Sequence, residues 1–130
     1  LPAAVVMQAW VLLITGGVLG TVGRFAFSDA ITRATGHPFP FGTLFVNTIG
    51  CAVAGFLAAF GERKMMWGAE ARMFWMVGLL GAFTTFSALI FESWRMVQTG
   101  QWAGAFANLL CSVALGFAAL AGGSALASLL

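Results

Sequence analysis

Uncharged hydrogen-bond donors occur deep inside the apolar stretches of this chain, where bulk water cannot solvate them. Asn47 is the most informative, because its side-chain amide can donate two hydrogen bonds. Other hydroxyl and amide residues lie at similar depth in separate stretches: Thr43, Thr84, Thr85, Ser87, Asn108 and Ser112. A row of neutral donors without a carboxylate beside them suits an anion better than a cation. The alternative for each residue is an ordinary hydrogen bond between helices, which is the simpler explanation for Asn47 taken alone.

A glycine-flanked segment, residues 78–87, interrupts one of these apolar stretches with hydroxyl groups. Backbone that leaves the helical pattern inside a bilayer is tolerated only within protein or beside a water-filled or ion-filled cavity. The sequence therefore predicts a broken third helix beside a polar path. Phe83 and Phe86 flank the two threonines, and a phenyl ring has a partly positive edge that can favour an anion.

The elements that must position these residues are membrane spans. The chain is 61% hydrophobic and 8% charged, with a mean hydropathy of +0.97. Four apolar stretches each have about the 20 residues that a helical span requires: roughly 3–25, 39–60, 73–91 and 102–126. The connecting segments, near 29–38, 61–72 and 95–101, are too short to hold a soluble domain. We expect an all-α integral membrane fold in which residues 1–130 form a single four-helix transmembrane domain.

The basic residues are balanced between the two sides of such a fold. Three lie on each side: Arg63, Lys64 and Arg72 on one, and Arg24, Arg33 and Arg95 on the other. Because orientation follows the excess of Lys and Arg in short loops, this split permits insertion in both directions. The alternative is that one of these charges lies deeper and a small bias decides the orientation.

Small residues at helical spacing indicate that the helices pack closely. They occur in three of the four spans: Gly16, Gly17, Gly20, Gly23, Gly50, Ala54, Gly116, Gly122 and Gly123. Each can serve packing within the chain alone. Four short helices leave little interior for a polar path, however. We therefore expect the small-residue faces, taken together, to support a homodimer.

Several other classes of protein are disfavoured. His37, Cys51 and Cys111 have no partners at metal-ligand spacing, and no span holds a catalytic constellation, so we expect no enzyme, no metal site built from these side chains and no nucleic-acid partner. A small multidrug exporter needs a buried carboxylate, whereas the acidic residues lie at or near span ends: Asp29, Glu62, Glu70 and Glu92. A non-transporting assembly subunit would not need the combination of Asn47 with the hydroxyl-rich break.

Three motifs carry a resemblance to a known family. They are Gly-x-x-x-Arg at residues 20–24, Gly-Thr-Leu-x-x-Asn at 42–47 and Gly-x-x-Gly-x-x-Thr-Thr-Phe-Ser at 78–87. With the length and the four spans, the whole chain resembles the bacterial Fluc, or CrcB, fluoride channels. The resemblance implies a passive fluoride-selective channel that exports fluoride across the bacterial inner membrane and confers resistance to fluoride. It also implies an antiparallel, dual-topology homodimer with two separate pores.

The resemblance further implies roles for residues along the fluoride path. Asn47 would donate a hydrogen bond to fluoride, and Phe86 would present its ring edge to the ion. Thr43 and Ser87 would be polar neighbours of the path, and Ser112 would be the polar residue that the fourth helix contributes to it.

Two further sites follow from the same resemblance. Arg24 would lie near a vestibule at the end of the first helix. The backbone carbonyls of Gly81 and Thr84 would hold a central sodium ion at the dimer interface, where the ion is structural and is not transported.

Two neighbouring positions depart from the family pattern. The family continues Thr-Thr-Phe-Ser with Thr-Phe, but this chain has Ala88 and Leu89, so a hydroxyl group and a second ring are missing. Helical spacing predicts that Leu89 lines the same path as Phe86. The alternative is that Leu89 faces lipid or the dimer core.

Overall fold

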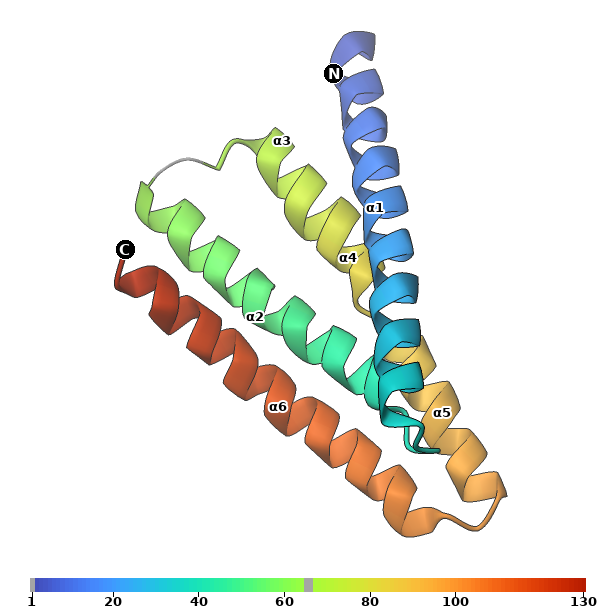
Figure 1. Cartoon of the computed structure of the whole chain (residues 1–130). Helices are drawn as coiled ribbons and strands as arrows, with labels where there is room; N and C mark the ends of the chain where they lie inside the picture. Colours follow the sequence, from blue (N-terminus) through green and yellow to red (C-terminus); the bar gives the residue numbers. More distant parts are fainter. Residues whose placement is uncertain (1, 65–66) are drawn as a thin grey trace.

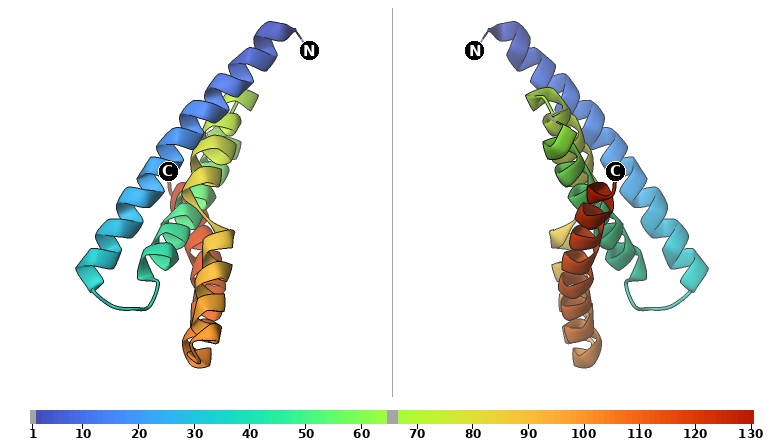
Figure 2. Two further views of the ribbon diagram at one scale, coloured as in Figure 1. Left: turned by 90° about the vertical axis from the view of Figure 1, so that its right-hand side faces the viewer. Right: turned by 90° about the vertical axis from the view of Figure 1, so that its left-hand side faces the viewer.

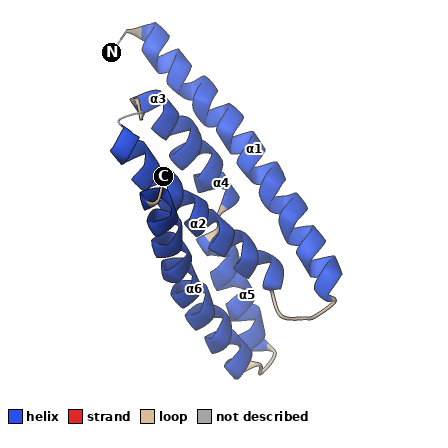
Figure 3. Cartoon of the chain, turned by 60° about the vertical axis from the view of Figure 1, so that its left-hand side comes forward, coloured by secondary structure: helices blue, strands red, loops and turns tan. Residues whose placement is uncertain are grey.

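The protein is built from long helices joined by short connections (Figures 1 and 3). A computed structural model describes residues 2–64 and 67–130. The elements run in the order α1 Ala3–Thr35, α2 Phe41–Lys64, α3 Ala69–Arg72, the π-helix η1 Met73–Leu80, α4 Gly81–Phe83, α5 Phe86–Gln98 and α6 Trp102–Ser128. The described residues include no β-strand.

Four helical stretches are long and apolar enough to cross a bilayer: Ala3–Thr35, Phe41–Arg63, Ala69–Gln98 and Trp102–Ser128. The third of them consists of α3, η1, α4 and α5. This confirms the predicted all-α fold with four membrane spans.

The first helix is longer than the sequence analysis predicted. It was expected to end near Phe25, with a connection near residues 29–38, but α1 continues to Thr35. Nothing in the intervening sequence breaks a helix, and Arg33 forms an ion pair of 2.9 Å with Asp29 one turn earlier. Gly36 ends the helix, because it adopts the left-handed conformation with φ 57° and its N–H bonds to the carbonyl of Thr32. The later connections are also shorter than expected, since α2 continues to Lys64 and α5 to Gln98.

The spans pack as two pairs (Figure 1). Helix α6 lies along α2, and α1 lies across the first half of the third span, mainly η1 and α4. Helix α5 packs against α6 near the short connection that joins them, and α1 also contacts α2 (Figure 1). Turning the molecule shows α1 set apart from the plane of the other helices (Figure 2).

Glycines allow the close approach within both pairs. A side chain at Gly20 would overlap the carbonyl oxygen of Leu79, and one at Gly123 would overlap that of Ala52. These contacts confirm that some of the predicted small-residue faces pack within the chain. Not every glycine of α1 lies in such a contact, because a side chain at Gly17 would meet nothing within 4 Å.

The third span is broken where the sequence predicted it. Thr84 and Thr85 leave the helical conformation, with φ/ψ of −85°/156° and −151°/110°. The chain then re-enters a helix at Phe86, with the Thr85 hydroxyl accepting a hydrogen bond of 3.2 Å from the Ala88 N–H as an N-cap. The π-helix before the break was not predicted.

Candidate functional site

The break is held in place by the side chain of Asn47 on α2. The Thr85 N–H donates to Asn47 Oδ1 at 2.7 Å, and Asn47 Nδ2 donates to the Thr85 carbonyl at 3.1 Å. Both backbone groups of a residue outside the helical ladder are therefore satisfied by one amide. These two hydrogen bonds engage the side-chain oxygen of Asn47 and one of its two amide N–H groups. One amide N–H remains for another acceptor.

The same arrangement frees backbone carbonyls at the break. In a continuous helix the Thr85 N–H would bond to the carbonyl of Gly81, four residues earlier. Here it bonds to Asn47, and the Thr84 N–H and hydroxyl both bond to the carbonyl of Leu80. No hydrogen bond found among the described residues goes to the carbonyl of Gly81 or Thr84. Gly81 is exposed on the surface of the chain, and Thr84 is partly exposed.

A cavity of about 330 Å³ adjoins the break on the side of α5. Three separate segments line it: Thr21, Arg24, Phe25 and Ser28 from α1, Thr43 and Val46 from α2, and Thr85, Ala88 and Glu92 from the break and α5. We call this the break cavity. Arg24 supplies a positive charge to it and has no ion-pair partner among the described residues. The lining of the break cavity thus holds a cationic group, Arg24, together with the carboxyl group of Glu92.

Glu92 lies in the wall of the break cavity, although the sequence analysis gave it no role. The Thr43 hydroxyl donates to Glu92 Oε1 at 2.6 Å. The other oxygen, Oε2, is buried without a hydrogen-bond partner in the described part of the chain. Thr43, which the resemblance placed beside the fluoride path, thus lines the cavity with its hydroxyl directed at this carboxyl group.

The remaining aromatic and hydroxyl residues near the break lie outside the break cavity. Phe86 is 75% exposed at the start of α5, and Ser87 beside it is also exposed. Leu89 is only 5% exposed. Within one chain, Leu89 and Phe86 therefore do not share an exposed face.

Polar residues of α6 form a separate buried cluster with α5. Asn108 is fully buried and donates to Ser93 Oγ at 3.0 Å, and Ser93 donates to the Leu89 carbonyl at 2.8 Å. Asn108 Oδ1 and Ser112 Oγ are buried without a partner among the described residues. Ser112 is therefore at span depth with an uncommitted hydroxyl group, but it does not line the break cavity.

The family of the chain follows from comparison with known proteins. A family model described as "CrcB-like protein, Camphor Resistance (CrcB)" matches residues 11–124. The chain belongs to the CrcB family. This confirms the resemblance that the three sequence motifs indicated.

Curated relatives in the CrcB family are similar along nearly the whole chain. A protein of Desulforapulum autotrophicum is 40% identical over 121 residues, which cover 93% of this chain and 97% of the relative. One of Opitutus terrae is 40% identical over 111 residues, with 84% of each covered. One of Maridesulfovibrio salexigens is 36% identical over 124 residues, with 95% of this chain and 98% of the relative covered. All three are named fluoride-specific ion channel FluC.

Sequence reasoning missed three polar residues of the break cavity: Thr21, Ser28 and Glu92. A signal for the first two was present, because Thr21, Arg24 and Ser28 recur at the spacing of one helical face. The three residues were not recognised as one helical face, because the first helix was predicted to end near Phe25. Glu92 follows Thr85 and Ala88 at helical spacing in the same way, but it was read as a residue at a span end.

Proposed function

We propose that this multi-pass membrane protein is a passive, fluoride-selective channel that exports fluoride across the bacterial inner membrane and so confers resistance to fluoride. The observation that carries the proposal is similarity to proteins named fluoride-specific ion channels over nearly the whole chain. The broken span supports it, because a membrane helix with a polar break beside a cavity provides a place for an ion.

The path begins at the break cavity. Fluoride is attracted by Arg24 and enters a region where neutral donors replace its water. The N–H of Asn47 that Thr85 does not use donates to the ion, while Thr43 and Ser112 are polar neighbours along the path. Entry requires donors that compensate for dehydration, and exit requires that none of them hold the ion too firmly. Neutral amide and hydroxyl groups meet both requirements.

A second, antiparallel copy of the chain completes the channel in this proposal. Phe86 and Ser87 are exposed beside the break, so a partner can bring them to the path. Gly17 and Gly122 have open space where a side chain would be, which suits close packing of another helix. The Phe86 ring then presents its positive edge to fluoride at the junction of the two copies. The buried Leu89 would line the path only where the path runs inside the chain.

The distribution of basic residues still permits dual topology. Arg24 lies inside α1, well before its end at Thr35, and faces the break cavity. It therefore contributes less to the charge of its side than a loop residue does. The remaining loop and helix-end charges are Arg33 and Arg95 against Arg63, Lys64 and Arg72. This is a small bias, and short membrane proteins with small biases can insert in both directions.

A sodium ion fits the break as a structural component. The Gly81 and Thr84 carbonyls have no hydrogen-bond donor among the described residues, and oxygen atoms are the ligands that hard cations prefer. Two antiparallel copies would supply two such pairs of oxygens around one point. The ion would fix the two breaks to each other and would not be transported.

Fluoride efflux from liposomes tests the function. Purified protein is reconstituted into vesicles loaded with fluoride or chloride at the same pH inside and outside, and a potassium ionophore is added to remove the charge limit. We expect rapid fluoride release and no chloride release above that of empty vesicles. Equal release of both ions, or no fluoride release from folded protein, would contradict the proposal. Dependence of the release on a pH gradient would instead indicate a coupled exporter, for which Glu92 would be the candidate carboxylate.

A further inference from the structure

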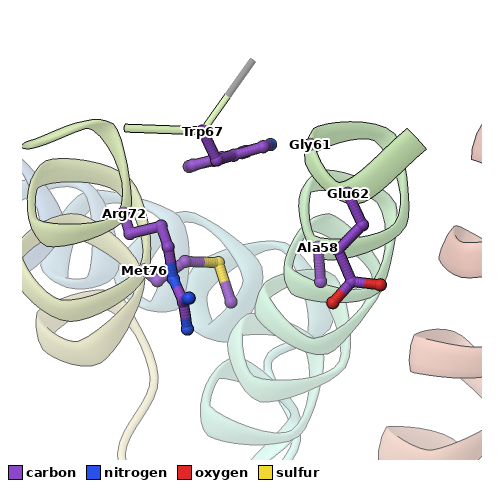
Figure 4. Close-up of a pocket in the computed structure, with 6 residues that line it drawn as sticks. All are labelled: Ala58, Gly61, Glu62, Trp67, Arg72 and Met76. Carbon is purple, nitrogen blue, oxygen red and sulfur yellow. The ribbon is translucent and has the colours of Figure 1, made fainter. Parts of the chain in front are cut away.

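We propose that a second cavity, at the opposite end of α2 from the break cavity, binds the headgroup of phosphatidylethanolamine. This cavity has a volume of about 380 Å³ and lies between the end of α2 and the start of the third span (Figure 4). It is lined by Ala58, Gly61, Glu62, Trp67, Arg72 and Met76, and we call it the α2–α3 cavity. None of these residues belongs to the proposed fluoride path.

Two opposite charges face the α2–α3 cavity without pairing. Glu62 lines it from α2 and Arg72 lines it from α3, on opposite sides (Figure 4). Neither side chain has an ion pair within the described residues, where the ion pair found is that of Arg33 with Asp29. A ligand with an ammonium group and a phosphate group can satisfy both charges at once, whereas a simple anion satisfies only Arg72.

The walls of the α2–α3 cavity suit a lipid better than a soluble molecule. Glu62 and Arg72 lie near the ends of two membrane spans, at the level where headgroups lie. Ala58 and Met76 line the cavity one helical turn further into the same two spans. The cavity is therefore charged at its outer end and apolar toward the bilayer, which matches the order of headgroup and acyl chain.

Trp67 gives the α2–α3 cavity its third recognition element. Its indole ring packs directly on Gly61, where a side chain would overlap the ring atoms. The ring thus lies between the two helices (Figure 4). An indole face attracts a cation, so it adds to the attraction of Glu62 for an ammonium group. The primary ammonium of phosphatidylethanolamine can also donate hydrogen bonds to Glu62, which the quaternary group of phosphatidylcholine cannot do.

Native mass spectrometry of the full chain tests this site. The protein in detergent is mixed with equal amounts of phosphatidylethanolamine, phosphatidylcholine and phosphatidylglycerol with identical acyl chains. We expect phosphatidylethanolamine to be retained about twofold to fivefold better than either other lipid, the range that one exposed charge pair gives. Equal retention of the three lipids would overturn the proposal.

Variants assign the preference to the two charges. Glu62→Gln should remove the preference for phosphatidylethanolamine over phosphatidylglycerol. Arg72→Gln should weaken the binding of all three phospholipids alike. The matched control is Asp29→Asn with Arg33→Gln, which removes the exposed ion pair of α1 and should leave the preference unchanged. A preference that survives Glu62→Gln, or that the control removes, would refute the assignment.

A soluble competitor separates the lipid from its headgroup. Phosphoethanolamine without acyl chains should displace little bound lipid, because it cannot use the apolar part of the cavity. If phosphoethanolamine displaced the bound lipid as effectively as free phosphatidylethanolamine does, the assignment to a membrane lipid would be overturned. No fluoride is present in these measurements, so their failure leaves the proposed function unaffected.

Discussion

The Asn47 amide has two tasks in this account, and replacing it by leucine separates them from ordinary packing. Asn47→Leu keeps most of the side-chain volume but removes both hydrogen bonds to Thr85 and the remaining N–H. Hydrogen bonds between membrane helices contribute about 0.6 kcal/mol on average and about 1.7 kcal/mol at most. A buried backbone group left without a partner costs more, about 1–3 kcal/mol. Thr85 is partly exposed and lines the break cavity, so we use the smaller figures, about 0.6–1.7 kcal/mol for each of its two hydrogen bonds to Asn47.

We therefore expect Asn47→Leu to lower the free energy of unfolding by about 1–3 kcal/mol in total. Fluoride flux per folded protein should fall by about tenfold to a hundredfold. The reason is that a hydrogen bond to a charged group contributes about 1.5–3 kcal/mol, which the ion loses with the amide. Asn47→Asp keeps the acceptor for the Thr85 N–H, yet it should reduce flux at least as much, because it faces an anion with a carboxylate.

Unfolding in mixed micelles and fluoride efflux from liposomes measure the two effects separately. Thr48→Val is the matched control, because the one hydrogen bond found for the Thr48 hydroxyl in the described part of the chain goes to the Leu44 carbonyl of its own helix. This variant should change neither quantity by more than a fraction of the Asn47 effect. Flux and unfolding of Asn47→Leu equal to those of Thr48→Val would refute both roles of the amide.

Three more perturbations test the packing, the path and the topology. Gly20→Ala should destabilise the protein by about 1–3 kcal/mol, because the new methyl group overlaps the Leu79 carbonyl. Gly23→Ala should be neutral or slightly stabilising, because its methyl group would make only an ordinary contact with the Phe83 ring, and equal destabilisation by the two substitutions in micelles would contradict the α1 packing. Phe86→Leu should reduce fluoride flux. Leu89→Phe should change fluoride flux or selectivity at some cost in packing. If neither Leu89→Phe nor Leu89→Ala alters fluoride or chloride efflux, Leu89 does not line the path. A cysteine added at the carboxyl terminus of a variant without native cysteines should react with a membrane-impermeant reagent from both faces of the membrane, and labelling from one face alone would exclude dual topology.

Much of the fold was predictable because its signals are local. Each span contains a long apolar stretch, and the break is marked by hydroxyl residues that follow two glycines. The close approach at Gly20 also follows from local composition, since only a small residue lets two helix backbones meet there. These features required no knowledge of which helices are neighbours.

The parts that were missed depend on contacts between distant segments. The π-helix Met73–Leu80 packs along α1, and no local pattern distinguishes its apolar residues from those of an α-helix. The break cavity combines stripes of α1, α2 and α5, so its membership depends on how those helices cross. The polar residues between Ser28 and Thr35 resemble a loop by composition, although the absence of a helix breaker before Gly36 lets the helix continue.

The selectivity of the current carried by the reconstituted protein tests the central claim most directly. Purified protein is placed in a planar bilayer with a fluoride gradient, the same chloride concentration on both sides and the same pH. We expect a current that needs no pH gradient and that reverses at the equilibrium potential of fluoride. A reversal potential that does not follow the fluoride gradient, or the absence of current from folded protein in the membrane, would contradict it.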